Sequence, residues 1–159
     1  MVDRYGKIIP NRQSIQGVIR LPINAYLNFA GNTRDVVLYY AKVFGLPEPQ
    51  LMTFGSVPPN PEFPLPPGTE DLIMHAALDI DGSKLMFSDT FPGMPFQVGN
   101  NISLAYVTGD EAKARDIFEQ LKDGGTVVME LQETFWSKVY GQVTDKFGIL
   151  WQISHEENK

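Results

Sequence analysis

The chain has no cysteine among its 159 residues, and it has no long run of apolar residues. Without cysteine there is no disulfide and no thiolate ligand for a metal, so a cytoplasmic protein is expected. A transmembrane helix needs about 18 consecutive apolar residues, and none of the apolar runs reaches that length. The first residues also lack the apolar core of a secretory signal. No membrane partner is therefore expected.

Basic residues are also few. The chain carries 13 Lys and Arg against 19 Asp and Glu, which gives a net charge of −6, and the basic residues form no stripe. A nucleic-acid-binding surface depends on such a stripe to neutralise phosphates, so no nucleic-acid partner is expected. The hydrophobic fraction of 43% is ordinary for a soluble protein of one domain. The predicted division is an N-terminal extension over residues 1–20 and a single domain over residues 21–159.

The first half of the domain is predicted to contain one helix and four strands. Residues 23–29 alternate between apolar and polar side chains, as a half-buried strand does. Apolar residues then recur at helical spacing up to Gly45, where the helix should end. The predicted elements are a strand at 23–29, a helix at 34–44, and strands at 51–54, 72–80 and 84–88.

Two connections in this half stand out. Asp81-Gly82 is a strong signal for a two-residue hairpin turn. Residues 56–70 hold six of the twelve prolines and show almost no periodicity. A loop of this length is either a solvated insertion or a wall over a pocket, and the sequence leaves both open.

The second half repeats the same order of elements. Its last two strands form a hairpin over residues 139–154, with a turn at residues 145–148 in which Gly148 supplies a positive φ. Alternation places Trp151 on an apolar face and Gln152 on the opposite face. The other predicted elements are a strand at 102–107, a helix that begins after Asp110 and stops at Gly124, a strand at 126–131 and a loop at 133–138.

An internal repeat follows from this order. Both halves read strand, helix and three strands, and Asn-x-x-Leu-x-aromatic opens each half, at Asn24 and at Asn101. Each unit has a helix on one face of a curved sheet, and its other face needs a cover. The predicted fold is α+β, with two βαβββ modules (residues 21–95 and 99–155), paired curved mixed sheets and the helices outside. The two sheets are expected to enclose a cavity.

This arrangement resembles the vicinal-oxygen-chelate superfamily, which includes glyoxalase I, bleomycin-resistance proteins and extradiol dioxygenases. Within it the chain resembles the PhnB-like branch, often labelled 3-demethylubiquinone methyltransferase-like, over residues 23–154. The motifs that carry the resemblance are residues 27–32 leading into the helix, His75-Ala76, residues 85–89, Trp136 with Tyr140-Gly141, and residues 145–148 with Trp151.

The resemblance also shows where metal ligands would lie. In metal-dependent relatives such as glyoxalase I, His and Glu on the first and last strands of each module bind the ion. The matching positions here are Asn24, Phe87, Asn101 and Gln152. Neutral amides are poor ligands for a divalent transition metal, and phenylalanine is none. We therefore expect no metal and no cofactor.

Two residues are candidates for acid–base catalysis. His75 is the histidine that falls inside a predicted strand, whereas His155 is assigned to a polar tail. His75 either satisfies a structural hydrogen bond or acts as a general base. Asp89 ends a strand, where it either stabilises a turn or lies at the mouth of a cavity.

The leading prediction is a protein that binds a small, partly apolar or aromatic ligand between its sheets, as a homodimer. The alternatives are a metal-free enzyme with His75 or Asp89 as acid–base and a metal-dependent lyase or dioxygenase. No nucleophile motif or nucleotide-binding fingerprint is present. The predicted ligand-binding residues are amides and aromatic side chains: Asn24, Tyr26, Asn28, Phe87, Asn101, Trp136, Tyr140 and Gln152.

Overall fold

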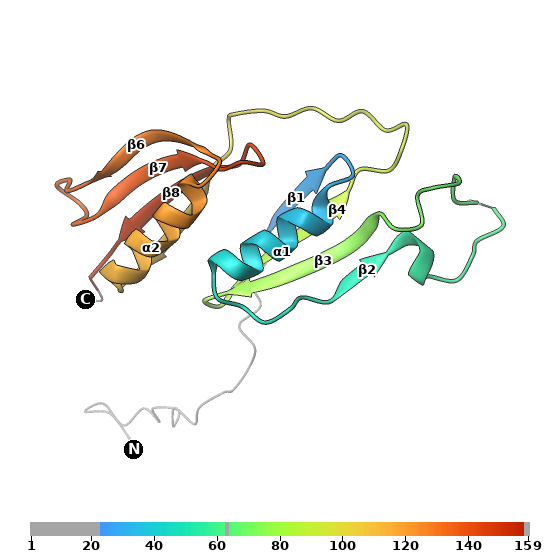
Figure 1. The fold of residues 1–159 in the computed structure, drawn as a ribbon, viewed down its shortest axis with the longest axis horizontal. Coiled ribbons are helices and arrows are strands. Elements are labelled where there is room, and N and C mark those ends of the chain that lie inside the picture. Colours follow the sequence, from blue (N-terminus) through green and yellow to red (C-terminus); the bar gives the residue numbers. More distant parts are fainter. Residues whose placement is uncertain (1–22, 63, 158–159) are drawn as a thin grey trace, which may run out of the picture.

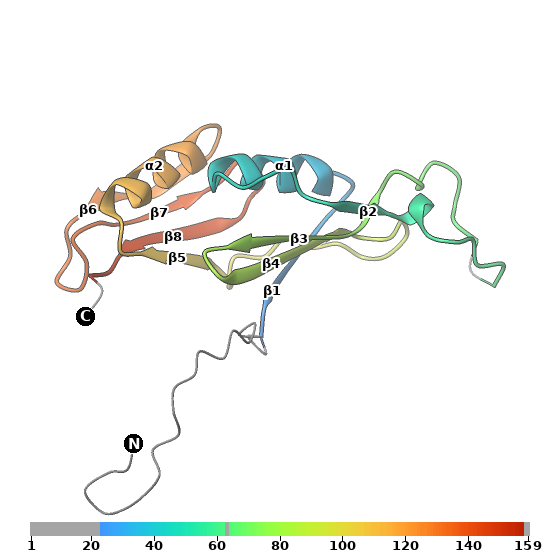
Figure 2. The ribbon, with the colours of Figure 1, turned by 90° about the horizontal axis from the view of Figure 1, so that it is seen from below.

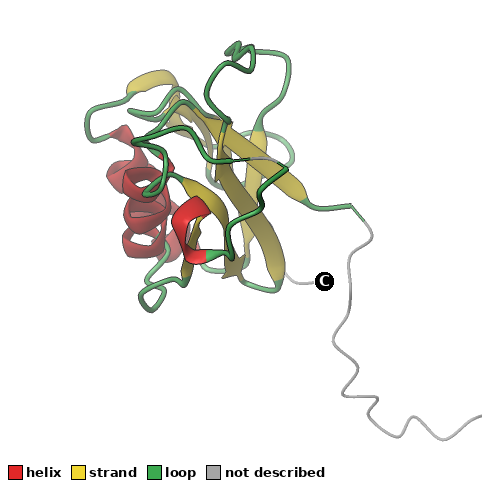
Figure 3. Ribbon diagram, turned by 90° about the vertical axis from the view of Figure 1, so that its right-hand side faces the viewer, coloured by secondary structure: helices red, strands yellow, loops and turns green. Residues whose placement is uncertain are grey.

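The computed structural model describes residues 23–62 and 64–157 of the chain. In this part, two four-stranded sheets lie next to each other and both α-helices lie on the same side of them (Figures 1 and 2). Figure 3, coloured by secondary structure, shows the α-helices beside the strands rather than between them. The predicted α+β fold with two βαβββ modules is confirmed. The predicted N-terminal extension lies outside the described residues.

The first module follows the predicted order closely. Its sheet has the strand order β1-β4-β3-β2, in which β1 and β4 are parallel and the other neighbours are antiparallel. The Asp81-Gly82 turn is confirmed, because both residues have positive φ, 48° and 88°. The elements are β1 (Ala25–Phe29), α1 (Thr33–Val43), β2 (Leu51–Thr53), the short 3₁₀ helix η1 (Phe54–Ser56), β3 (Ile73–Ile80) and β4 (Ser83–Asp89).

The second module repeats this topology with the order β5-β8-β7-β6 and a parallel β5–β8 pair. The Asp110 side chain caps α2 by accepting a hydrogen bond from the Lys113 amide at 3.0 Å. The first strand of this module begins at Leu104, two residues later than predicted, and Asn101 lies in the linker before it. The elements are β5 (Leu104–Thr108), α2 (Glu111–Lys122), β6 (Thr126–Gln132), β7 (Tyr140–Thr144) and β8 (Leu150–His155).

Each sheet buries the face that its helix covers. Leu85 and Phe87 of β4 are 6% and 0% exposed beneath α1, and Trp151 and Ile153 of β8 are 3% and 0% exposed in the second module. Leu85, Phe87 and Trp151 alternate with more exposed neighbours, as the period of a strand requires, whereas β8 stays buried from Ile153 to its end. We call the opposite surface of the two sheets, away from the helices, the open face. In the described residues, no helix has both the length and the apolar character needed to cross a membrane.

Two tyrosines join the modules through the hairpin turns. Tyr40 of α1 donates its hydroxyl hydrogen bond to Asp145 in the β7–β8 turn at 2.5 Å. In the reverse direction, Tyr106 of β5 donates to Asp81 in the β3–β4 turn at 2.6 Å, and the Lys113 ammonium lies 2.8 Å from the same carboxylate. Each turn aspartate thus accepts a bond from the other module. The Lys113 and Tyr106 bonds hold the pKa of Asp81 below its ordinary value.

The Tyr40 contact predicts a loss of stability at alkaline pH. Burial, and after it the negative charge of Asp145, raises the pKa of Tyr40 well above the ordinary value of 10.0. The folded protein keeps this phenol protonated, whereas the phenol of the unfolded chain ionises near pH 10. The contribution of Tyr40 to the free energy of unfolding is therefore fully present below pH 10 and is lost as the pH rises above it. One such proton is worth up to about 1.4 kcal/mol per pH unit.

Urea unfolding between pH 8 and pH 11.5 measures this slope. Tyr40→Phe should make the alkaline decline shallower than in the wild type, because the variant lacks the buried phenol. Tyr26→Phe is the matched control, since Tyr26 is 42% exposed on the open face, and it should keep the wild-type slope. Equal slopes in the wild type and Tyr40→Phe would contradict the assignment.

Candidate functional site

The open face of the second sheet carries a chain of four polar side chains. Gln142 Nε2 donates to the Tyr140 hydroxyl at 2.8 Å, and that hydroxyl donates to Gln152 Oε1 at 2.8 Å. Gln152 Nε2 then donates to Ser103 Oγ at 2.7 Å. Gln142 and Gln152 are direct partners across the β7–β8 ladder, which explains why the same tyrosine reaches both. All four side chains are half-buried, so a ligand on this face can reach them.

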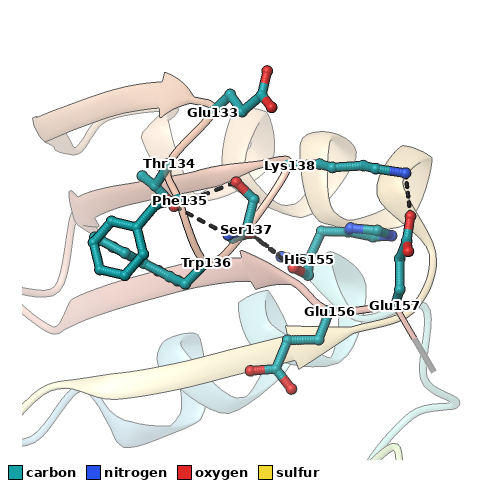
Figure 4. A pocket seen from close by; sticks show the side chains of 9 residues that line it. All are labelled: Glu133, Thr134, Phe135, Trp136, Ser137, Lys138, His155, Glu156 and Glu157. Atoms are coloured by element: carbon teal, nitrogen blue, oxygen red, sulfur yellow. Dashed lines mark hydrogen bonds and ion pairs between the residues drawn. The ribbon is translucent and has the colours of Figure 1, made fainter. Parts of the chain in front are cut away.

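Trp136 extends this network toward the edge of the sheet. Its ring lies 5.5 Å from the Tyr140 ring and 4.5 Å from Phe135, in edge-to-face geometry. Trp136 is 54% exposed and Phe135 is 96% exposed. A pocket of about 680 Å³ surrounds the loop that carries them (Figure 4). Exposed aromatic rings of this kind are typical of contact surfaces.

The loop is anchored by a buried serine and by the end of β8. Ser137 Oγ lies 2.7 Å from the carbonyl oxygens of both Val139 and His155, and it also accepts a bond from the His155 amide (Figure 4). The assignment of His155 to a polar tail is wrong. His155 is the last residue of β8 and is 7% exposed, because β8 runs one residue beyond its predicted end at residue 154.

The open face of the first sheet carries a smaller polar group. The Tyr26 hydroxyl lies 3.3 Å from His75 Nδ1, and the Ser88 hydroxyl donates to Asn28 Oδ1 at 3.1 Å. Tyr26 and Asn28 are neighbours on one face of β1, and Ser88 is the β4 partner of Asn28. His75 therefore faces the open side, as the alternation on its strand predicts.

A groove of about 870 Å³ joins the two polar groups. Its walls come from β1, from the linker between the modules and the first residue of β5, and from single residues of β6 and β7. The β7–β8 turn and the first residue of β8 complete them. Both modules thus contribute to one hollow, but it is an open groove rather than the enclosed cavity that was expected between the sheets. The residues that line it include Tyr26, Asn28, Asn101, Ser103, Thr144 and Leu150.

Three of the eight predicted ligand-binding residues line the groove, namely Tyr26, Asn28 and Asn101. Trp136, Tyr140 and Gln152 do not line it, and the remaining two lie elsewhere. Asn24 lines a separate cleft of about 360 Å³, which lies between the start of β1, the β3–β4 turn and β5 and also includes Asp81 and Tyr106. Phe87 is fully buried against Tyr40, with ring centroids 5.9 Å apart, and its side chain does not reach the open face. The alignment of the two modules that matched Phe87 with Gln152 was out of register by one residue, because the structure matches Phe87 with Trp151. A slip of one residue moves a side chain to the other face of a strand.

Asp89 has a structural explanation. It is 5% exposed, and its carboxylate accepts bonds from the amides of Gly31, Thr33 and Ile73 at 2.7–3.1 Å and from the Thr33 hydroxyl at 2.6 Å. These contacts hold the start of α1 against the first sheet, where the Asn32 side chain supplies no cap. With its oxygens turned into the protein, Asp89 is placed to stabilise the fold rather than to meet a ligand.

Two members of the polar chain, Ser103 and Gln142, are not among the predicted ligand-binding residues. Ser103 lies just before β5, outside any motif, so nothing in its sequence context separates it from an ordinary loop serine. Its importance comes from Gln152, which lies 49 residues away along the chain. Alternation along β7 places Gln142 on the same face as Tyr140, and that signal was available.

Comparison with known proteins identifies the family. The model of the 3-demethylubiquinone-9 3-methyltransferase family matches residues 22–154. The chain belongs to this family. This PhnB-like chain is 35% identical over 141 residues to protein YjdN of Escherichia coli K12. The aligned region covers 84% of this chain and 95% of YjdN.

Solved structures agree with the family assignment. Protein PA1353 from Pseudomonas aeruginosa is similar to this PhnB-like chain with a TM-score of 0.76, at 33% identity over 87% of this chain and all of PA1353. The PhnB protein from Bacillus cereus has a TM-score of 0.65 at 26% identity, covering 86% of this chain and all of that protein. A glyoxalase/bleomycin resistance protein/dioxygenase family enzyme from Burkholderia phytofirmans PsJN shares the fold alone, with a TM-score of 0.53 at 14% identity over 82% and 96% of the two chains.

The side chains gathered at the groove and in the two polar groups, all in the described part of the chain, do not suit a divalent transition metal. Within the described residues, no group of three or more His, Cys, Asp or Glu side chains is placed to hold one. The donors in the two polar groups are amides, hydroxyls and the lone His75, and amide and hydroxyl oxygens are poor ligands for such an ion. These donors suit hydrogen bonds to an organic ligand.

Proposed function

We propose that this PhnB-like protein binds a small, partly apolar or aromatic molecule in the groove, without a catalytic metal. The observation that carries the proposal is the chain from Gln142 to Ser103, which fixes the Ser103 hydroxyl at the wall of an uncharged groove. Ligand sites typically combine an apolar lining with a few fixed polar groups. Tyr26 and Phe96, each 42% exposed, and Phe147 add ring surfaces in the groove on which an aromatic ligand can stack.

We also propose that the protein is a homodimer. Several apolar side chains lie exposed on the strands and on the linker. A second copy that covers them would also close the groove, and twofold dimers are the commonest soluble oligomers. The residues are Tyr26 at 42% exposure, Met52 at 46%, Val107 at 48%, Val128 at 56% and Ile102 at 77%.

Filling the groove should weaken binding. The probe is 2-acetylnaphthalene, a neutral aromatic ketone, titrated into the full chain by calorimetry. Thr144→Trp places a large ring in the groove and should lower the affinity at least tenfold, because the ring occupies the volume of the ligand. Ala112→Trp is the matched control, because Ala112 is exposed on α2, away from the open face, and it should bind as the wild type does. Equal affinities in all three proteins would contradict the proposed site.

A metal-free enzyme is the second candidate function. The observation that favours it is the contact between the Tyr26 hydroxyl and His75 Nδ1, because Tyr26 lines the groove and the pair could transfer a proton. If a turnover is found, His75→Ala should abolish it while leaving ligand affinity within a fewfold of the wild type. Turnover that survives in His75→Ala would rule this candidate out.

The family description names a methyltransferase, but the fold does not support that chemistry. The two sheets in the described residues are mixed and four-stranded, and each has a single parallel pair. A nucleotide-like cofactor usually binds where a glycine-rich turn opens a helix in a doubly wound parallel sheet. We therefore do not propose methyl transfer.

A further inference from the structure

The hydrogen bonds of the open face run in one direction. Gln142 donates to Tyr140, Tyr140 to Gln152, and Gln152 to Ser103. A serine hydroxyl that accepts a bond still has one hydrogen to donate. Among the described residues, no acceptor for that hydrogen is recorded. The chain therefore ends at the groove wall on a hydrogen-bond donor, and each bond along it strengthens the next.

The groove has a second property, which is the lack of charge in its lining. Its walls are built from 19 side chains and glycines in the described part of the chain, and none of them is Asp, Glu, Lys, Arg or His. Two carboxylates belong to residues close to the groove lining: Asp145 follows Thr144, and Asp89 is paired with Phe29 of β1. They are 3% and 5% exposed, and both accept hydrogen bonds from groups inside the protein. The neutral lining contrasts with the net charge of −6 of the whole chain.

We propose that the groove selects uncharged aromatic molecules that carry an accepting oxygen, such as an aryl ketone or an aryl amide, and that this oxygen accepts the Ser103 hydrogen bond. This inference rests on the proposed function and adds the ligand class to it. An ionised carboxylate or ammonium group would leave water for a wall without a counter-charge, which is unfavourable. A purely apolar molecule would leave the Ser103 hydroxyl without a partner.

Four probes with the same ring system separate these contributions. They are 2-acetylnaphthalene, 2-ethylnaphthalene, 2-naphthoate and 2-naphthylmethylammonium, titrated at pH 7 into the full chain and followed by amide chemical shifts in NMR spectra. The ketone should bind about three to ten times more tightly than the ethyl compound, which is the usual effect of one net hydrogen bond. Both ions should bind at least ten times more weakly than the ketone.

Ser103→Ala tests the donor directly. It should remove the preference for the ketone over the ethyl compound and leave the affinity for the ethyl compound within about twofold of the wild type. Ser83→Ala is the matched control, because Ser83 lines the separate cleft with Asp81 and not the groove. Ser83→Ala should keep the full preference.

The outcomes separate the ligand class from the binding function. If the probes shift the amides of Ser103 and Leu150 but naphthoate or the ammonium compound binds as tightly as the ketone, the groove is a binding site and the inferred ligand class is wrong. The inferred class is also wrong if Ser103→Ala keeps the ketone preference. If none of the four probes binds, or if the shifts lie away from the groove, the proposed function and the inferred ligand class both fail.

Discussion

Asp145→Ala should lower the free energy of unfolding by about 3–5 kcal/mol, because each buried donor left without its acceptor costs about 1–3 kcal/mol. The carboxylate is 3% exposed and accepts bonds from the Tyr40 hydroxyl at 2.5 Å and the Trp151 indole at 2.9 Å. It also accepts the amides of Phe147 and Ile149 within its own turn. The substitution therefore breaks the turn and a contact between the modules together. Urea unfolding at pH 7 measures the loss.

The internal repeat supplies a matched control for this prediction. Asp81 occupies the corresponding turn of the first module and also accepts a tyrosine hydroxyl, but its side chain is 52% exposed. Asp81→Ala should therefore lose no more than about 1 kcal/mol from its exposed contacts. It loses about 1 kcal/mol more because alanine replaces aspartate at a positive φ, and the total stays below that of Asp145→Ala. In the Tyr40→Phe background, Asp145→Ala should cost less than in the wild type, since one donor is already gone. Similar losses for Asp145→Ala and Asp81→Ala would show that burial does not decide the effect.

Asp89→Ala should have a comparable effect, again about 3–5 kcal/mol, because it leaves three amides and one hydroxyl without an acceptor. Two of those groups belong to Thr33 and one to Ile73, and both residues are fully buried. The loss should free the start of α1 from the first sheet. Urea unfolding together with hydrogen exchange of the α1 amides would show both effects.

Ser88→Ala is the control for Asp89→Ala, because Ser88 is the preceding residue of β4 and faces the open side. It should change the free energy of unfolding by less than about 1 kcal/mol, the usual size of one part-exposed hydrogen bond. The folded fraction of Asp89→Ala should bind 2-acetylnaphthalene with wild-type affinity. A stable Asp89→Ala protein that has lost binding would instead place Asp89 in the site.

Much of the fold could be predicted because its signals are local. The Asp81-Gly82 turn needs residues that tolerate positive φ, and the turn before Gly148 has the same requirement, so both are visible in the sequence. The helix that ends near Gly45 follows from a 3.6-residue period. Alternation also placed Tyr26 and Asn28 on the correct face of β1, since a strand has a fixed period of two.

The incorrect or missing predictions concern strand register and contacts between residues that are far apart in the sequence. Leu85 and Phe87 alternate with Met86 and Ser88, so the alternation within β4 was a better guide than its alignment with β8, which placed Phe87 on the wrong face. The bond from Tyr40 to Asp145 spans 105 residues and leaves no local trace. Ser103 acquires its role from a strand 49 residues away, which only the packed fold reveals.

Native mass spectrometry of the protein purified without added ligand tests the central claim most directly, because one spectrum reports the subunit count, the bound small molecule and any metal. The expected species is a dimer that carries an organic molecule of small mass, released on mild activation, with no stoichiometric transition metal. A monomer without bound organic mass, or a species that carries one transition-metal ion per subunit and loses it on chelation, would contradict the account.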